Sequence, residues 1–380
     1  MDLNDYFDPV SIQKPLTRHV RPGDELGKKL VIHTPGRSVP DLQGYDLALL
    51  GVPEDRNSQN KGASSAPDPV RQKLYTLSRI RNKIQMIDLG NMRPGKTPAD
   101  TWYGLRDIVF HLLEKRVVPV IMGGTQDITG ACYEALVKYK KDPGLLTVDA
   151  RLDLSKGARE YSSGNWLEKI IKKKHAGFHY TNLGHQEYMT GPGDLEKLRK
   201  RGYRSYRLGR VRSDMKYFEP CFRDAHIHSY DISAVRQSDA PGTFITSPNG
   251  FSGLEMCQMA RFSGLSDQVS VFLVTEVNPL LDNRDQTAHL AAQVIWYFAD
   301  AFSQRVIETP DPENENFTQY IVSLADSPYK LTFLKSNRTD RWWIKTPDEQ
   351  NTKWKACSYE DYQMAGRQEI PERWLDFFKQ

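Results

Sequence analysis

Short apolar runs recur along most of the chain, and many of them end in Gly, Asp, Asn or Pro. Runs that are short and continuously apolar, rather than alternating with polar residues, predict strands that are buried on both faces. We expect eight such strands, within residues 45–52, 84–91, 117–124, 145–150, 178–184, 206–211, 227–233 and 269–278.

Segments with helical spacing lie between most of these runs. They cover residues 68–81, 101–115, 127–140, 193–201, 253–262 and 285–301. Strands that alternate with helices are typical of βαβ units and a parallel sheet. The pattern therefore predicts an α/β protein with three αβα layers and a parallel sheet of about eight strands. In such sheets ligands bind at the carboxyl ends of the strands.

The last 70 or so residues have a different pattern of apolar and polar positions. After the Pro- and Glu-rich stretch 308–316 the alternating pattern returns, which predicts a hairpin that turns at Asp326, Ser327 and Pro328, followed by a charged, helix-poor tail. We expect an N-terminal extension over 1–44, the α/β domain over 45–310 and a Trp-rich C-terminal extension over 311–380. The rings of Trp342, Trp343, Trp354 and Trp374 either pack this tail onto the core or form an exposed surface for a protein partner.

Composition and charge narrow the function classes. The chain has 52 basic and 48 acidic residues, a balance that argues against binding to nucleic acid or to an anionic membrane surface. The basic runs 172–174 and 197–201 are typical of solvated helix faces. The four cysteines form no CxxC pair, no apolar stretch reaches membrane-spanning length, and the first residues lack the apolar core of a signal peptide. We expect a cytoplasmic protein.

Polar residues gather at four of the expected strand ends. They lie within residues 123–127, 149–153, 229–233 and 275–279. Asp149 and Asp153 flank Arg151 after one strand, an arrangement typical of a metal site except for the arginine between them. Such a concentration of acidic and amide groups indicates a site.

These strand ends resemble the ureohydrolase family, which includes arginase, agmatinase and formiminoglutamase. The resemblance covers about residues 45–305. It is carried by the segments GVPEDRNSQNKGASSAPDPVRQKL, PVIMGGTQD, TVDARLD, SSGN, HSYDISAV, GFSGLE and TEVNPLLD, taken in order and spacing, and NLGHQEY is most similar to the formiminoglutamase branch. The resemblance implies the arginase-like fold. It also places Ser163, Gly164 and Asn165 in the substrate loop.

The resemblance implies two manganese ions held by two histidines and four aspartates. The ions activate a shared water for attack on a guanidinium or formimino carbon. Position by position, Asp149, Asp153 and Asp231 are kept. The two histidines become Gln126 and Arg151, the last aspartate becomes Ser233, and a family histidine falls near Leu167. Glu255 matches a family glutamate near the substrate, or it is a surface helix residue.

Among the substitutions at the family's metal-ligand positions, Arg151 has the largest physical consequence. A guanidinium stays protonated and has no lone pair for a metal. Two unit charges about 4 Å apart repel by about 4 kcal/mol at an effective dielectric of about 20, and a divalent ion doubles that. If the strand continues through 149, 151 and 153, the three side chains share one face. Our hypothesis is that Arg151 replaces the metals by pairing with Asp149, Asp153 and Asp231.

Plainer interpretations apply to several of these residues. Asp149 and Asp153 are also typical of exposed strand-end caps. His226 and His228 have the opposite parity to Asp231, so we expect them to be packing or hydrogen-bonded histidines. Asp127 is placed to cap the helix that follows it.

Three functions follow from these residues. The leading one is an arginase-fold pseudoenzyme without cofactor, in a structural, regulatory or protein-binding role. The second is a metal-dependent C–N hydrolase of the formiminoglutamase, arginase or agmatinase type, acting on a linear amidine or guanidino substrate through manganese at Asp149, Asp153 and Asp231. The third is a crevice in which Arg151 binds a small anionic ligand. Family members often form trimers or hexamers, which leaves an oligomer open.

Overall fold

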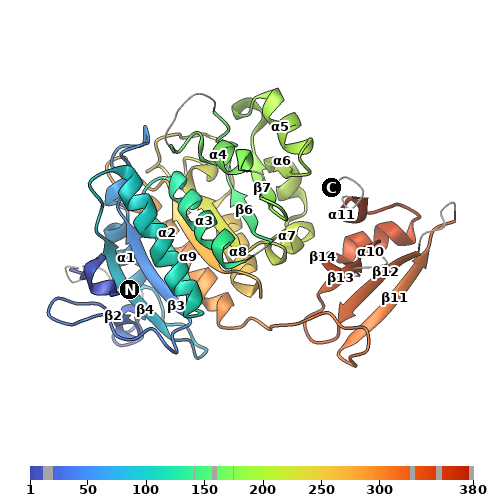
Figure 1. Ribbon diagram of the computed structural model, residues 1–380, viewed down its shortest axis with the longest axis horizontal. Helices are drawn as coiled ribbons and strands as arrows, with labels where there is room; N and C mark the ends of the chain where they lie inside the picture. Colours follow the sequence, from blue (N-terminus) through green and yellow to red (C-terminus); the bar gives the residue numbers. More distant parts are fainter. Residues whose placement is uncertain are drawn as a thin grey trace.

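A central, mostly parallel sheet organises the main body of the protein (Figure 1). The computed structural model describes residues 1–11, 20–140, 142–155, 161–173, 175–325, 330–347 and 353–375. Within them the sheet has ten strands, which are β1 Phe7–Asp8, β2 Val31–Ile32, β3 Leu47–Val52, β4 Met86–Met92, β5 Val118–Gly123, β6 Gly144–Val148, β7 His179–His185, β8 Arg204–Arg207, β9 Ile227–Asp231 and β10 Val271–Thr275.

The strand order is β1-β4-β3-β5-β10-β9-β6-β7-β8, with β2 also paired to β4. All of these pairings are parallel except that of β1 with β4. The parallel α/β sheet predicted from the sequence is therefore confirmed. Its short strands β1 and β2 come from the N-terminal 44 residues, which the sequence pattern had set outside the sheet.

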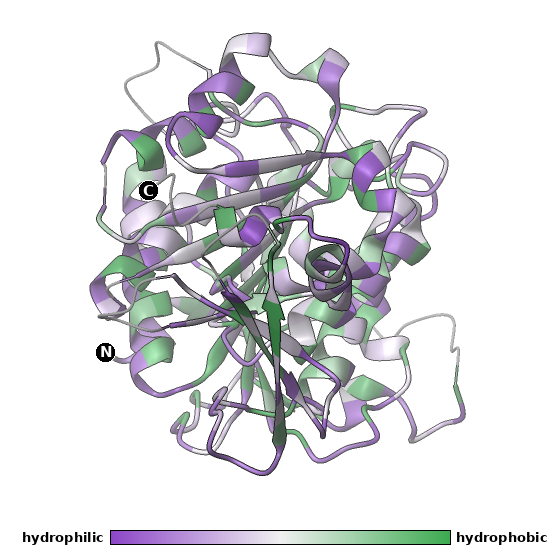
Figure 2. Ribbon diagram, turned by 90° about the vertical axis from the view of Figure 1, so that its right-hand side faces the viewer, coloured by the Kyte–Doolittle hydropathy of each residue, from purple (hydrophilic) through white to green (hydrophobic). Residues whose placement is uncertain are grey.

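Helices cover both faces of the sheet. One face carries α1 Pro67–Thr76, α8 Gly253–Leu265 and α9 Gln286–Phe302, and the other carries α2 Pro98–Glu114, α3 Thr129–Tyr139 and α4 Trp166–Lys172. Successive residues of one strand enter the two separate cores, with Leu49 on the α9 side and Leu50 on the α2 side. Figure 2 shows the hydrophobic residues concentrated in these central strands. Continuous apolar runs arise because both faces of each strand are buried.

One predicted strand is partly wrong. The run expected as a strand over 206–211 is a strand only as far as Arg207, because α6 Leu208–Ser213 begins there. The remaining helices of the main body are α5 Pro192–Arg199 and α7 Glu219–Arg223. Strand β8 lies at the edge of the sheet and is only half-buried. A strand in that position does not need a continuous apolar run, which is why its four mostly polar residues form one.

The C-terminal extension contains more structure than a hairpin and tail. Strands β11 Phe317–Ser323, β12 Lys330–Ser336, β13 Trp342–Lys345 and β14 Trp354–Cys357 form an antiparallel sheet, followed by α10 Tyr359–Gly366 and α11 Glu372–Leu375. The expectation of a helix-poor tail is wrong, and the predicted turn at 326–328 lies outside the described residues. Trp342, Trp343 and Trp374 are buried and Trp354 is half-buried. The packing interpretation expected these rings to pack the tail onto the core, but Trp342 and Trp374 belong to a hydrophobic cluster of the extension's own residues. Strand β14 lies against α7 (Figure 1).

Within the described residues, no helix is long and apolar enough to cross a membrane.

Candidate functional site

The polar residues predicted to form a site meet at the carboxyl edge of the sheet. Strands β5, β10, β9 and β6 are neighbours in that order. Gln126 follows β5, Asp149 follows β6, Asp231 ends β9 and Glu276 follows β10. All four side chains are buried. The polar residues expected at this edge are therefore brought together there, and three of these four side chains are carboxylates.

Gln126 joins two of these carboxylates. With its amide nitrogen turned toward them, the Gln126 side chain donates to Asp149 Oδ2 at 3.0 Å and to Asp153 Oδ2 at 3.1 Å. Its backbone N–H donates to Glu276 Oε1 at 2.7 Å. A neutral amide thus lies between two aspartates at the position that the family resemblance assigns to a metal-binding histidine.

Arg151 does not form the bidentate network that the sequence led us to expect. Strand β6 ends at Val148, so the shared parity of 149, 151 and 153 does not apply. The Arg151 backbone N–H donates to Asp149 Oδ1 at 2.8 Å, which turns the chain out of the strand. Arg151 Nη2 lies 3.9 Å from Asp153 Oδ1, an ion pair without a hydrogen bond, and its buried Nε has no hydrogen-bond partner.

The other retained aspartates are satisfied by protein donors. Trp166 Nε1 donates to Asp153 Oδ2 at 2.8 Å, and the Ser233 backbone N–H donates to Asp231 Oδ1 at 2.7 Å. Asp153 has a φ of 44°, in the left-handed region that non-glycine residues rarely occupy. Strained backbone of this kind is concentrated at functional sites.

Glu276 is a site residue that the sequence analysis did not single out. Its Oε2 accepts a hydrogen bond from Asn60 Nδ2 at 2.8 Å, and its φ of 67° is also left-handed. Asn278 Nδ2 holds Asn60 in place through Asn60 Oδ1 at 2.6 Å. The position of Glu276 at the end of an apolar strand could have identified it from the sequence, as it did Gln126, Asp149 and Asp231.

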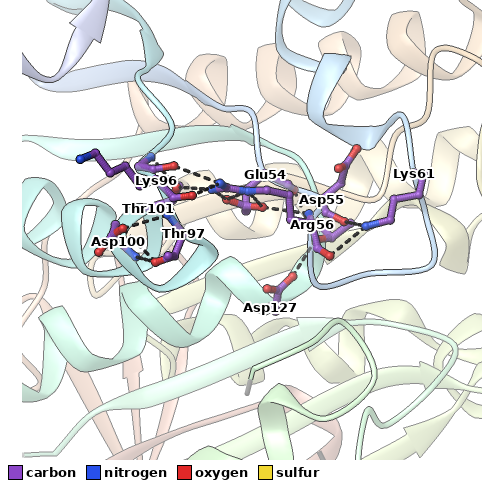
Figure 3. Close-up of polar contacts among 11 residues, drawn as sticks. Glu54, Asp55, Arg56, Lys61, Lys96, Thr97, Asp100, Thr101 and Asp127 are labelled. Atoms are coloured by element: carbon purple, nitrogen blue, oxygen red, sulfur yellow. Dashed lines mark hydrogen bonds and ion pairs between the residues drawn. The ribbon is translucent and has the colours of Figure 1, made fainter. Parts of the chain in front are cut away.

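The loop after β3 contributes Ser58, Gln59 and Asn60 to the walls of the crevice. Figure 3 shows the polar contacts that Glu54, Arg56 and Lys61 of this loop make. Arg56 donates to the Glu54 carboxylate through Nε at 3.0 Å and to Thr101 Oγ1 through Nη2 at 2.8 Å. Lys61 Nζ donates to the backbone oxygens of Asp55 and Arg56. These contacts hold the loop so that Ser58, Gln59 and Asn60 line the crevice.

The space inside the crevice is small. A cavity of about 30 Å³ remains, enough for roughly one water molecule. Its walls include Asn60, Arg151, Ser163, Ser233 and Glu276. Ser163, from the predicted substrate loop, is held by a 2.8 Å hydrogen bond between its hydroxyl and that of Ser58. Gly164 and Asn165 continue the loop into α4, and Asn165 Oδ1 accepts from the Ser162 N–H.

Burial and mutual repulsion raise the pKa values of the carboxyls at this edge. Burial raises the pKa of Asp153 to about 6 and, with the nearby charges of Asp231 and Asp153, raises that of Glu276 to about 8. The pKa values of Asp149 and Asp231 are also raised, in both cases chiefly by burial. Arg151 opposes these shifts at Asp149, Asp153 and Asp231, and its own pKa rises because the carboxylates stabilise its charge.

The raised pKa of Glu276 predicts that stability falls as the pH rises from 6.5 to 8. The folded protein holds this proton where the unfolded chain, with a Glu pKa of 4.5, has released it, so its contribution is lost as the pH rises through about 8. The loss over this window should be on the order of 1–2 kcal/mol. Urea denaturation at several pH values measures it.

The groups that act in the opposite direction titrate mainly outside this window. Burial lowers the pKa of His226 to about 3 and of His228 to about 4, so their effect lies mostly below the unfolded His pKa of 6.5, and the lowered pKa of Lys355, about 8, acts mostly above the window. A Glu276→Gln variant should have a flatter profile. A wild-type profile that is flat or rises from pH 6.5 to 8 would contradict the prediction.

Three residues singled out in the sequence lie elsewhere. Glu255 is a helix cap: its carboxylate accepts from Ser252 N and Oγ and pairs with Arg212 Nε at 2.8 Å, and it does not line the crevice. His226 and His228 are buried at the opposite, amino end of β9, where their rings meet Gly144 N and Ala225 O. They are hydrogen-bonded core histidines, as their parity predicted.

The crevice does not fit a pair of manganese ions. The two positions expected for imidazoles hold an amide that already bridges Asp149 and Asp153, and a guanidinium that repels cations. Ser233 offers a neutral hydroxyl in place of a carboxylate. Among the residues that the structure describes, no group of three or more His, Cys, Asp or Glu side chains is arranged to hold a metal ion.

Comparison with known proteins extends the resemblance seen in the sequence. The family model described as the arginase family matches residues 45–300. The formimidoylglutamase of Bacillus subtilis (strain 168) is 25% identical over 281 residues, which cover 67% of this chain and 86% of that protein. The formimidoylglutamase of Corynebacterium efficiens is 26% identical over 281 residues, which cover 69% and 87%.

Solved structures share the fold. The formimidoylglutamase of Bacillus subtilis superposes with a TM-score of 0.67 at 19% identity, over 78% of this chain and 97% of that one. The Trypanosoma cruzi formiminoglutamase with Mn²⁺ superposes with a TM-score of 0.65 at 21% identity, over 69% of this chain and 95% of that one.

Proposed function

The chain belongs to the arginase family, and we propose that it is a formiminoglutamase-like protein in which a protein-only polar network has replaced the two-manganese centre. The observation that carries the proposal is the Gln126 amide, which donates to both Asp149 and Asp153 where a metal ion would compete for the same oxygens. Arg151 supplies the positive charge beside them. The role that fits such a crevice is binding or regulation rather than hydrolysis.

A second function is favoured by the relatives themselves. Similarity over two thirds of the chain to formimidoylglutamases supports a metal-dependent hydrolase of linear amidines better than it supports a loss of activity. In that case Asp149, Asp153 and Asp231 would hold a divalent ion, which would supply an activated water. That function requires Gln126 and Arg151 to move away from the carboxylates.

One experiment separates the two functions. The protein is purified without chelator in manganese-containing medium, its metal content is measured by mass spectrometry, and turnover of formiminoglutamate, arginine and agmatine is assayed. We expect substoichiometric manganese and no turnover above background, with the Bacillus subtilis formimidoylglutamase as positive control. Stoichiometric manganese together with turnover would overturn the proposal and establish the hydrolase.

A further inference from the structure

A second cavity lies at the opposite end of the sheet from the crevice. It has a volume of about 490 Å³ and opens at the amino ends of β6, β7 and β8, where β14 of the C-terminal extension lies beside α7. Strand β7 begins at His179 beside this cavity and ends at His185 on the crevice side. The two cavities are therefore separated by the length of a strand.

The side chains around this cavity carry an excess of positive charge. Among the described residues, its walls include four basic side chains, Arg201, Arg204, Lys353 and Lys355, against two carboxylates, Asp142 and Asp224. The formal charge of this lining is thus +2. Such a balance attracts anions, and the low-dielectric walls of a cavity strengthen the attraction.

Lys355 is the most informative of these cations. Its side chain is half-buried in the wall of the cavity. Burial and the nearby positive charges of Arg204 and Arg373 together lower its pKa to about 8, against the opposing effect of Asp224. Lys355 therefore lies where basic groups from two parts of the chain come close together.

The cavity is assembled from two parts of the chain. Arg201 and Arg204 belong to the α/β body, whereas Lys353 and Lys355 come from the extension, beyond the residues 45–300 that match the arginase family. Arg223 of α7 fixes β14 in place by donating through Nη2 to Cys357 O at 2.9 Å. The arrangement of cations thus depends on the docking of the extension.

We propose that this cavity binds a small molecule that carries phosphate groups. Arginine donors suit phosphate oxygens, and lysines add point charges around them. The volume lies in the range of small-molecule sites, so a phosphorylated metabolite fits as well as an inorganic anion. The proposal is independent of the function of the crevice, because it uses neither the carboxylates nor Arg151.

Isothermal titration of the full chain with inorganic pyrophosphate tests the proposal at physiological salt. We expect saturable one-site binding that weakens at least tenfold in Lys355→Gln and in Arg204→Gln. Lys355→Gln removes a cation that is costly to bury, so it should remain folded. Lys353→Gln, at an exposed position, serves as a second variant and should also weaken binding.

The control is Lys335→Gln, since Lys335 pairs with Asp340 on the same C-terminal sheet but does not line the cavity. It should bind as wild type does. A parallel titration with ADP identifies the source of the phosphate: tighter binding of ADP than of pyrophosphate supports a nucleotide, and the reverse supports an inorganic or non-aromatic phosphate. Absence of binding by either probe, or equal weakening in the control, overturns the proposal.

Discussion

The triple variant Gln126→His/Arg151→His/Ser233→Asp is expected to bind manganese much more tightly than the wild type. The changes remove the bridging amide and the repelling guanidinium and add two imidazoles and a carboxylate beside Asp149, Asp153 and Asp231. Imidazole and carboxylate ligands together suit manganese. Without metal the variant should be less stable than wild type, because it adds a buried carboxyl to a cluster whose pKa values are already raised.

Thermal unfolding with and without Mn²⁺ measures the gain. A free metal concentration of about 100 times Kd should stabilise the variant by about 2.7 kcal/mol, whereas the wild type should not respond. The matched control is Gln126→His/Ser233→Asp, which retains Arg151 and should bind manganese far more weakly, because repulsion of a divalent ion about 4 Å away costs about 8 kcal/mol at an effective dielectric of about 20. A wild type that responds as strongly as the triple variant would show that the metal centre was never lost.

Much of this site could be located from the sequence because it follows apolar strands. Each of β5, β6, β9 and β10 is a continuous buried run, so the polar residue after it marks the carboxyl edge of the sheet. What the sequence did not contain was the pairing of side chains across that edge. Gln126 and Asp149 follow β5 and β6, which are separated in the sheet by β10 and β9. Only the completed topology brings the amide to the two carboxylates.

The expected role of Arg151 depended on an assumption about local backbone. Side-chain alternation holds only while a strand continues, and β6 ends before Asp149. The Asp149 side chain then accepts from the Arg151 N–H, a turn that redirects the arginine. Glu276 directly follows an apolar strand and could have been included on that ground, but its partner Asn60 is 216 residues away, and no local pattern signals that contact.

Several short strands were not predicted from the sequence, for related reasons. Strands β1 and β2 have two residues each, too few for any periodicity, and they exist because they pair with β4. The C-terminal extension was underestimated because its strands β13 and β14 have four residues each and are separated by polar segments. Tertiary pairing, rather than local preference, forms such elements.

The second large effect is expected at the contact that anchors the C-terminal extension. Arg373 Nε lies 3.2 Å from Asp361 Oδ2, and both side chains are almost fully buried. Arg373 Nη2 also donates to Tyr217 O at 3.0 Å, so one guanidinium joins α10 to the main body. An Arg373→Met variant should lose about 3–5 kcal/mol in the free energy of unfolding, because it leaves Asp361 buried without its counter-charge.

A control on the same extension isolates the effect of burial. Arg367 pairs with Glu360 at 3.4 Å, but both side chains are exposed, so Arg367→Met should cost at most about 1 kcal/mol. The double variant Arg373→Met/Asp361→Asn should recover part of the loss, since it removes the uncompensated charge while sacrificing the hydrogen bonds of the Asp361 carboxylate to Ser358. Urea denaturation compares the three variants, and limited proteolysis reports whether the extension has separated from the body. If Arg373→Met cost no more than Arg367→Met, the extension would be held by its buried aromatic rings, and the buried ion pair would contribute only to the geometry of docking.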